Sequence, residues 1–326
     1  MRKKQRDTLA RSAMKLLCSL LGIILGVMIA VTCAFQHLVS QIHTVTPSDE
    51  SALPVFSLSN VLQSKPEASA HPLISNETRV VNILLIGQDR REGETQARSD
   101  SMILCTFDRD ADKLTLTSFL RDLYLPIPGH GSNRINAAYS FGGMTLLEQT
   151  LEENFDLVVD GAIEVDFQQF SQIIDLLGGV TMELRQDEAD TINRETGSNL
   201  SEGAQLLTGQ QTLTYSRIRS LDPDGDISRT GRQRKIMGAL VESFRGASPS
   251  TLLTLVKQLL PMISTDLNNG QLLMLALEIA PQMAELQITS QRIPADGTFT
   301  DKTIDGMRVL SADLDAAKKL LQDTTN

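Results

Sequence analysis

Cysteine is scarce in this chain, with three residues among 326. Cys18 and Cys33 fall within an uncharged apolar segment near the N-terminus, which leaves Cys105 alone in the remainder. One isolated cysteine forms no intramolecular disulfide, so the folded part must be stabilised by a hydrophobic core. We expect Cys105 to be a small buried apolar residue in a strand, without a chemical role.

Several other signatures are also missing. No internal repeat is apparent, which argues against a solenoid, and neither a Gly-x-Gly-x-x-Gly motif nor a P-loop occurs. The histidines at positions 37, 43 and 71 lack the spacing of metal ligands. The formal net charge of −10 argues against a general nucleic-acid surface, because phosphate backbones bind basic faces.

The N-terminus has the pattern of a membrane anchor. Basic side chains dominate residues 1–15, and residues 16–35 carry no charge, about the length that a spanning helix of roughly 20 residues needs. The positive flank predicts a single-pass protein of the cell membrane, with the N-terminus cytoplasmic and the remainder outside. A cleaved signal peptide is the alternative, but its apolar core is usually only about 7–15 residues long. We therefore favour an uncleaved signal anchor.

The rest of the chain divides into a linker and one large domain. Residues 36–78 mix Ser, Thr and Pro, which predicts a semi-extended extracytoplasmic linker. Residues 79–326 are numerous enough to bury a sizeable core as a single domain. The predicted order is therefore a cytoplasmic tail (1–15), a transmembrane anchor (16–35), this linker and a catalytic domain.

Three strands open the large domain. Short apolar runs rich in β-branched residues occupy positions 81–87, 101–107 and 114–118, and each is bounded by Gly, Asp or other turn residues. The turn-rich residues 108–113 separate the second run from the third, which predicts a hairpin. The end of the third strand then returns to the edge of the sheet where the second begins.

Charged residues gather at this predicted edge. Asp89 follows the first strand, Asp100 precedes the second and Arg121 follows the third, at a rim where open sheets tend to bind ligands. Two carboxylates there suit a hard cation, and an arginine suits a phosphate. The alternative is that Asp89 and Asp100 are only turn and cap residues. From its position alone, Arg134 fits a surface cation near a turn.

The remaining elements predict helices packed on a sheet. Gly and Pro in residues 123–131 predict an irregular loop, and Gly142 and Gly143 shape the start of a helix. The other predicted elements are helices at 144–154, 167–177 and 313–321, strands at 157–165, 180–184 and 286–293, and a loop or short exposed helix at 185–201. Strand–helix–strand order over 157–184 implies a parallel crossover. The predicted fold is an α-β-α sandwich with a central mixed sheet flanked by helices, plus one N-terminal transmembrane helix.

A second group of arginines lies in the C-terminal half. Arg217 and Arg219 are followed by Arg229, Arg232 and Gln233. Arg229 and Gln233 are four residues apart, so they share one face of a helix that begins near residue 227. Arginine in preference to lysine indicates bidentate recognition of an oxyanion.

Several of these stretches resemble the motifs of the LytR-CpsA-Psr family. The opening motifs are NILLIGQDR at 82–90, RSDSMIL at 98–104 and SFLRD at 118–122, and the arginine-rich residues 215–234 are similar to a later motif. Family members often carry Lys where this chain has Arg134, and either side chain can bind a phosphate. These proteins are membrane-anchored enzymes of bacterial envelopes, called cell envelope-related transcriptional attenuators in older usage.

The resemblance implies an Mg²⁺-dependent phosphotransferase. It would transfer an undecaprenyl-pyrophosphate-linked anionic glycopolymer, such as teichoic acid or capsule, to peptidoglycan outside the membrane. The implied catalytic residues are Asp89, Asp100 and Arg121; the first two would hold Mg²⁺, and a carboxylate such as Asp89 would accept the acceptor's proton. The implied pyrophosphate ligands are Arg121, Arg134, Arg217, Arg219, Arg229 and Gln233. Such transfer depends on positioning and electrostatics.

Two alternatives to this function remain at the level of sequence. The first is a hydrolase that cleaves lipid pyrophosphates with water as the acceptor. The second is a non-catalytic envelope regulator that binds polyprenyl pyrophosphate, although a tail of residues 1–15 is too short for a DNA-binding domain.

Overall fold

A computed structural model describes residues 43–44, 79–89, 98–245 and, with short gaps between 246 and 284, the chain as far as residue 324. The chain divides into two compact units, Met1–Ile42 and His43–Asn326, and the account below concerns the second. The predicted cytoplasmic tail and transmembrane segment lie outside the described residues. Among the residues that are described, no helix is both long and apolar enough to cross a membrane.

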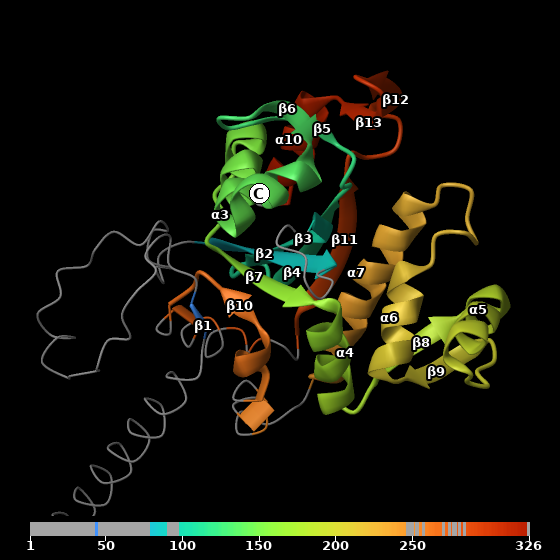
Figure 1. The fold of residues 1–326 in the computed structure, drawn as a ribbon. Helices are drawn as coiled ribbons and strands as arrows, with labels where there is room; N and C mark the ends of the chain where they lie inside the picture. Colours follow the sequence, from blue (N-terminus) through green and yellow to red (C-terminus); the bar gives the residue numbers. More distant parts are fainter. Residues whose placement is uncertain are drawn as a thin grey trace, which may run out of the picture. The chain divides into compact units, whose positions relative to one another are not determined.

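A seven-stranded mixed sheet forms the centre of this unit (Figure 1). Its strands, in spatial order, are β1 (His43–Thr44), β10 (Ser264–Thr265), β7 (Gly161–Asp166), β2 (Val80–Asp89), β3 (Arg98–Asp108), β4 (Lys113–Phe119) and β11 (Gln287–Ile293). The pairs β2–β3 and β3–β4 are antiparallel, whereas β2–β7 and β4–β11 are parallel. The prediction of a central mixed sheet is confirmed, including the hairpin of β3 and β4.

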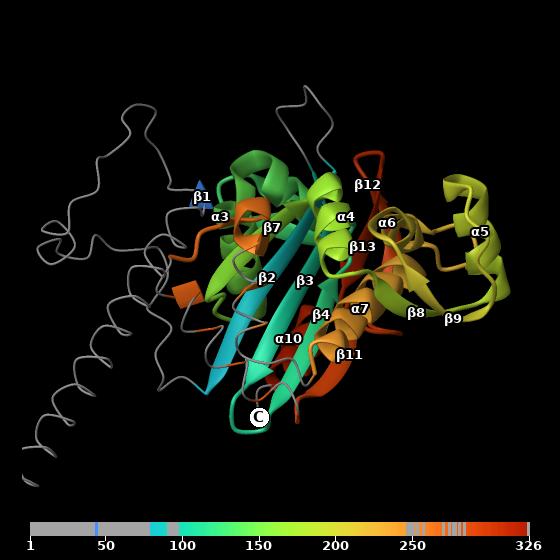
Figure 2. The ribbon, with the colours of Figure 1, turned by 90° about the horizontal axis from the view of Figure 1, so that it is seen from below.

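Helices cover both faces of this sheet (Figure 2). On one face, α3 (Ile135–Phe155) and α10 (Leu314–Gln322) pack over a core to which β2, β3 and β4 contribute alternate apolar residues such as Leu84, Leu104 and Phe119. On the other face, α7 (Asp226–Ser243) crosses β3 and β4. Because successive side chains of a strand point to opposite faces, only every second residue of each strand enters this core.

An irregularity at the end of β2 brings Asp100 to the rim. Gly87 pairs with Ser101 while the next residue, Gln88, pairs with Ser99, so Asp100 is an extra residue in β3. A bulge of this kind redirects a side chain and is common beside active sites. The residues at the carboxyl end of β2 and the beginning of β3 therefore do not follow the regular alternation of the sheet.

The two glycines at positions 142 and 143 divide α3. Gly143 has a φ of 64° and Gly142 leaves the helical region, so the element consists of two helical pieces joined at a kink. The prediction that this pair shapes the start of the helix from residue 144 is confirmed. The structure adds a helical piece before it, which begins directly after Arg134.

The prediction of an irregular loop over residues 123–131 is wrong. The segment forms β5 (Tyr124–Ile127), which pairs with β6 (Gly131–Arg134) in an antiparallel hairpin. Leu125 and Ile127 are buried, while Pro126 faces outward between them. Proline is tolerated at such an edge position because no ladder donor is needed there.

The predicted parallel crossover over residues 157–184 is also wrong. After α4 (Phe167–Leu176), strand β8 (Val180–Leu184) does not return to the central sheet but pairs with β9 (Gly203–Leu207). The parallel partner of β7 is instead β2.

The pair β8–β9 belongs to a second core, separate from that of the central sheet. It is shared with α5 (Gln186–Thr196), α6 (Gly209–Arg217) and α7. Residues 185–201, for which a loop or a short helix was expected, thus contain a helix. A last hairpin, β12 (Phe299–Ile304) with β13 (Met307–Ala312), precedes α10.

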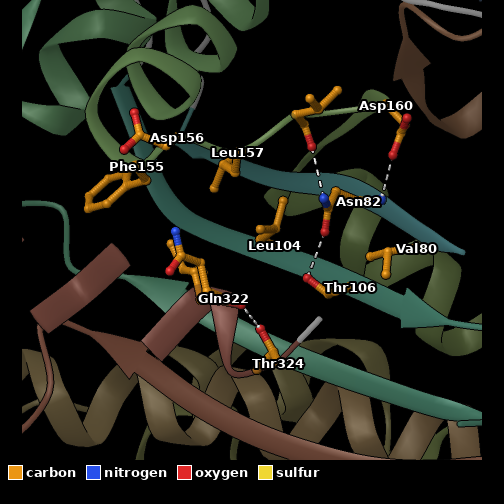
Figure 3. A pocket seen from close by; sticks show the side chains of 12 residues that line it. Val80, Asn82, Leu104, Thr106, Phe155, Asp156, Leu157, Asp160, Gln322 and Thr324 are labelled. Carbon is orange, nitrogen blue, oxygen red and sulfur yellow. Dashed lines mark hydrogen bonds between the residues drawn. The ribbon is translucent and has the colours of Figure 1, made fainter. Parts of the chain in front are cut away.

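One cavity of about 430 Å³ lies at the end of the sheet where β2 begins (Figure 3). Val80, Leu104 and Phe155 are among its lining residues, and Asn82 at its edge hydrogen-bonds Thr106 and the carbonyl of Val158. Since β2 runs from this cavity to Asp89, the cavity lies at the opposite end of the strand from the predicted ligand rim.

Cys105 is a strand residue, as predicted, and is partly buried. The residue lies in β3 beside Val81, Ile83 and Leu267, and burial raises the pKa of its thiol to about 12. The reactive thiolate should therefore stay scarce until the pH approaches that value.

The reactivity of Cys105 can be measured in a chain in which the other two cysteines are replaced, Cys18→Ser with Cys33→Ser. At about pH 8 we expect iodoacetamide to modify Cys105 roughly tenfold or more slowly in the native protein than in the protein unfolded in urea. Equal rates would contradict this placement.

Candidate functional site: a guanidinium and carboxylate cluster at the sheet rim

The predicted rim brings Asp100 and Arg121 together. Because β3 and β4 pair in an antiparallel hairpin, with Ile103 opposite Ser118, the chain after β4 returns to the beginning of β3. Arg121 Nη1 lies 2.8 Å from Asp100 Oδ1. This contact confirms the geometric prediction for these two residues.

The position of the Asp89 backbone is defined by strand pairing. It is the last residue of β2 and pairs in register with Arg98, which puts it at the same end of the sheet as Asp100. The side chain of Asp89 lies outside the described part of the chain. Its proximity to a ligand therefore stays a prediction.

Asp226 joins the two arginine-bearing regions. It opens α7, and its Oδ1 lies 2.9 Å from Arg229 Nη2, 3.6 Å from Arg121 Nε and 3.7 Å from Arg219 Nε. Arg121 comes from the end of β4, whereas the other two arginines flank the start of α7. Segments about a hundred residues apart thus share one carboxylate, as the family resemblance implies.

Arg134 reaches the same cluster through Asp122. The β5–β6 hairpin returns the chain so that Tyr124 faces Arg134, and Arg134 Nη1 lies 3.2 Å from Asp122 Oδ1. The other oxygen of Asp122 lies 3.8 Å from Arg121 Nε. The hairpin that sequence analysis missed is therefore the element that positions Arg134.

Gln233 lies one turn along α7 from Arg229. Its side-chain oxygen accepts a 3.0 Å hydrogen bond from the hydroxyl of Ser101. This bond fixes α7 to the beginning of β3, next to Asp100, so Gln233 lies at the rim as predicted.

Arg217 has a different setting. Its guanidinium lies over the ring of Phe167, 5.0 Å from the centroid, a cation–π arrangement that holds the side chain without neutralising it. With Arg219 it lines a polar cavity between α5 and α6. Arg217 thus borders the cluster around Asp226 rather than joining it.

Burial and charge act in opposite directions on the central arginines. Burial holds the pKa of Arg229 below its ordinary value, although Asp226 counteracts it, and the cations Arg219 and Arg121 lower it further. Burial also opposes the charge of Arg121, but Asp226, Asp100 and Asp122 outweigh it, so its pKa is raised. The carboxylates therefore neutralise the positive charge of the arginines only in part, as an anion site requires.

Several donors in the cluster have no acceptor. The Nε atoms of Arg121, Arg134 and Arg229 are buried and make no hydrogen bond within the described part of the chain. Buried donors without partners are rare and call for an explanation. A bound oxyanion would supply acceptors to all of them, and guanidinium groups match phosphate geometry particularly well.

The rim also offers ligands for a cation. Within the described ranges, no group of three or more acidic, His or Cys side chains could hold a metal ion by itself. Mg²⁺ commonly takes one or two carboxylates and completes its shell with waters and substrate phosphates. Only Oδ1 of Asp100 accepts a hydrogen bond from Arg121, and a carboxylate has further lone pairs for a cation. The donor set fits a magnesium ion shared with a bound diphosphate.

Sequence analysis gave no role to Asp226 or Asp122, and it left Arg232 as a neighbour of Arg229 without a role of its own. Asp226 precedes Arg229 by three residues, a helical spacing that predicts an ion pair, so a signal was present. Arg232 is not an oxyanion ligand: it is buried and paired with Glu188 and Asp222, away from the cluster. It stabilises the second core.

Comparison with known proteins identifies the family. A family model described as the LytR_cpsA_psr family matches residues 50–326, so the chain belongs to this family. It is 36% identical over 238 residues to the polyisoprenyl-teichoic acid–peptidoglycan teichoic acid transferase TagU of Oceanobacillus iheyensis, covering 71% of each chain. The match to TagU of Bacillus mycoides, 38% identical over 178 residues, covers 54% of this chain and 56% of that protein.

A solved structure shares the fold and holds a ligand. The LytR-CPS2A-psr family protein YwtF (TagT) with bound octaprenyl pyrophosphate lipid has a TM-score of 0.59 and 25% sequence identity, over 76% of this chain and 91% of that chain. The mixed α/β architecture with a central mixed sheet is therefore that of the family.

Removing the charge of Asp226 should destabilise the protein. Arg229 is buried, and breaking a buried ion pair leaves an uncompensated charge. We expect Asp226→Asn to lower the free energy of unfolding by about 2 kcal/mol in urea titrations. The control is Asp224→Asn, at an exposed carboxylate just before the same helix, which should change it by less than about 0.5 kcal/mol. Equal stability of the two variants would show that Asp226 does not hold the arginines together.

Proposed function

We propose that this protein transfers a polyprenyl-pyrophosphate-linked anionic glycopolymer, teichoic acid or a similar polymer, to peptidoglycan. The observation that carries the proposal is the cluster of partly unpaired guanidinium groups around Asp226 at the rim of the sheet. Membership of the family, the transferase names of its relatives and the polyprenyl pyrophosphate bound by TagT support it.

The reaction converts a phosphoanhydride into a phosphodiester. A hydroxyl oxygen of a peptidoglycan sugar attacks the phosphorus that bears the polymer, the P–O bond to the acceptor forms, and the P–O–P bridge breaks. The polymer keeps one phosphate, polyprenyl phosphate leaves, and the hydroxyl proton passes to a base, for which Asp89 is the candidate. Charge builds on the phosphoryl oxygens, so fixed cations at the site lower the barrier.

The arginines of the cluster carry out the binding and the charge stabilisation. Arg121 and Arg229 have Nε donors free for the diphosphate, and Arg134 approaches from the β5–β6 hairpin. Arg217 and Arg219 border the site on the side of α6. Gln233 holds α7 against β3 through Ser101 and so keeps the two halves of the site in register.

We further propose that Asp89 and Asp100 hold Mg²⁺ at this site. When bound, the ion would neutralise charge on the diphosphate and orient it. The lone pairs of Asp100 and the position of Asp89 at the same end of the sheet support this assignment.

The location that this reaction requires agrees with the N-terminal sequence. We propose that residues 16–35 anchor the protein in the cell membrane, with residues 1–15 in the cytoplasm. Residues 36–78 would then link the anchor to an extracytoplasmic catalytic domain at 79–326, where both the lipid-linked donor and peptidoglycan are found. The uncharged segment and its basic flank support this topology.

Truncating the charged pair at the rim should abolish transfer. We expect Asp100→Ala and Arg121→Ala each to lower the rate roughly 100-fold or more, measured with purified lipid-linked donor and peptidoglycan acceptor. Both side chains lie at the rim rather than in the core, so the variants should remain folded. The controls are Asp301→Ala and Arg308→Ala, exposed residues of the β12–β13 hairpin.

The same assay separates the alternatives. Full activity in both rim variants would refute the proposal. Release of polyprenyl phosphate without a glycan acceptor would favour a hydrolase, and tight lipid binding without turnover would favour a regulator.

Removal of the metal ion should stop transfer by the full chain. We expect a chelator to reduce transfer to background and added Mg²⁺ to restore it, because the diphosphate then regains its counter-ion. As a control, the residual activity of Asp100→Ala should respond less to either treatment. Transfer that continues unchanged in the chelator would refute the metal assignment while leaving the arginine cluster intact.

A further inference from the structure

A second pair of arginines, Arg234 and Arg292, lies where α7 meets β11, the last strand of the central sheet. The Nε atom of Arg234 donates a 3.3 Å hydrogen bond to the hydroxyl of Ser290. Arg292 follows Ser290 by two residues in β11, so the two side chains leave the strand on the same face. Two cations thus share one face of β11, and they repel one another.

The two arginines differ in how their charge is balanced. Arg292 is buried and donates hydrogen bonds to the carbonyl of Pro294 and the carboxylate of Asp296. Arg234 pairs with no carboxylate in the described part of the chain, and its Nη1 atom is buried without a hydrogen bond. Burial and, to a smaller extent, Arg292 lower the pKa of Arg234 to about 10, so the side chain is still charged at neutral pH. A partly buried cation of this kind lacks a counter-ion.

A neighbouring hydroxyl also lacks a partner. Ser118 of β4 pairs in register with Arg292 of β11, so both side chains leave the sheet on the face that α7 covers. The Oγ atom of Ser118 is buried and makes no hydrogen bond to any described residue. Buried polar groups without partners are rare and call for an explanation. An oxyanion at this place would supply both an acceptor for these donors and the missing negative charge.

We propose that Arg234 and Arg292 form a second oxyanion subsite, which binds a phosphodiester in the backbone of the donor polymer. The inference rests on the proposed function, because an anionic glycopolymer carries further phosphates beyond the diphosphate. Arg234 follows Arg229 by five residues in α7, which places it about 7.5 Å farther along the helix. Ser290 is exposed and Arg234 is half-buried, so a polymer reaches this subsite from the outer side of β11.

Two contacts on one substrate reinforce each other. Once the diphosphate is bound at Arg121 and Arg229, a phosphodiester of the same polymer meets Arg234 at a high effective concentration, so even a weak contact raises the affinity for the whole donor. A charge without a counter-ion is unfavourable for folding, whereas it favours the binding of an anion. Replacing Arg234 should therefore weaken binding of the polymer without destabilising the protein.

The test measures binding to the full chain in detergent micelles by titration calorimetry. The short probe is a soluble N-acetylhexosamine 1-diphosphate, and the long probe is the same compound extended by several glycerol phosphate units. Inorganic pyrophosphate and the glycerol phosphate oligomer alone are the other two probes. The variant is Arg234→Gln. The matched control is Lys235→Gln, which removes the same charge from the next, exposed position of α7.

We expect the wild-type chain to bind the long probe roughly tenfold or more tightly than the short probe, the effect of one charged hydrogen-bond contact. In Arg234→Gln this gain should disappear, while the affinities for pyrophosphate and the short probe and the midpoint of urea unfolding do not fall. Lys235→Gln should behave as the wild type does. An equal gain in Arg234→Gln, a lower unfolding midpoint, or an equal loss for all the probes would overturn the inference.

The remaining outcomes separate this inference from the proposed function. If the wild-type chain binds both diphosphate probes equally well, the subsite is refuted and the proposed function stands without it. If the chain binds no diphosphate, the proposed function fails, and the oligomer alone decides about the subsite. Oligomer binding that Arg234→Gln weakens and Lys235→Gln does not would then support the subsite, and its absence would refute it.

Discussion

The desolvated ion-pair cluster around Asp226 is the constraint on which the site depends. One carboxylate faces guanidinium groups from the end of β4 and from both sides of the start of α7. These cations would repel one another without it, and burial already lowers the pKa of Arg229. The acid therefore holds cations close together in a partly dry environment, where their field on a phosphate is stronger than in water.

The topology of the sheet explains why the cluster forms at this rim. The parallel neighbours β2 and β7 end at the same edge, and the hairpin of β3 and β4 returns Arg121 to the residue that the bulge displaces, Asp100. The helix α7 then crosses β3 and is fastened there by the bond between Ser101 and Gln233. The second core, around β8 and β9, lies beneath the polar cavity and the two arginines that border it.

Local sequence patterns predict part of this arrangement and tertiary contacts decide the rest. The strands β2, β3 and β4 follow from apolar runs, and the pair of Asp100 with Arg121 follows from one short turn. The role of Asp226 depends on how α7 docks across the sheet, which no local spacing specifies. The hairpin of β5 and β6 was hidden because Pro126 resembles a loop residue until its outward-facing edge position is known. Likewise, the strand pattern of β8 does not show which strand it will pair with, and in the structure it pairs with β9 rather than β7.

The central claim is that the arginines of both regions meet around a single diphosphate. A crystal structure of the full chain with a polyprenyl pyrophosphate would test it most directly. We predict that the diphosphate oxygens lie within hydrogen-bonding distance of Arg121 and Arg229 together, near Asp100. A diphosphate bound at another surface, with Asp226 and its arginines unchanged and unliganded, would contradict the account.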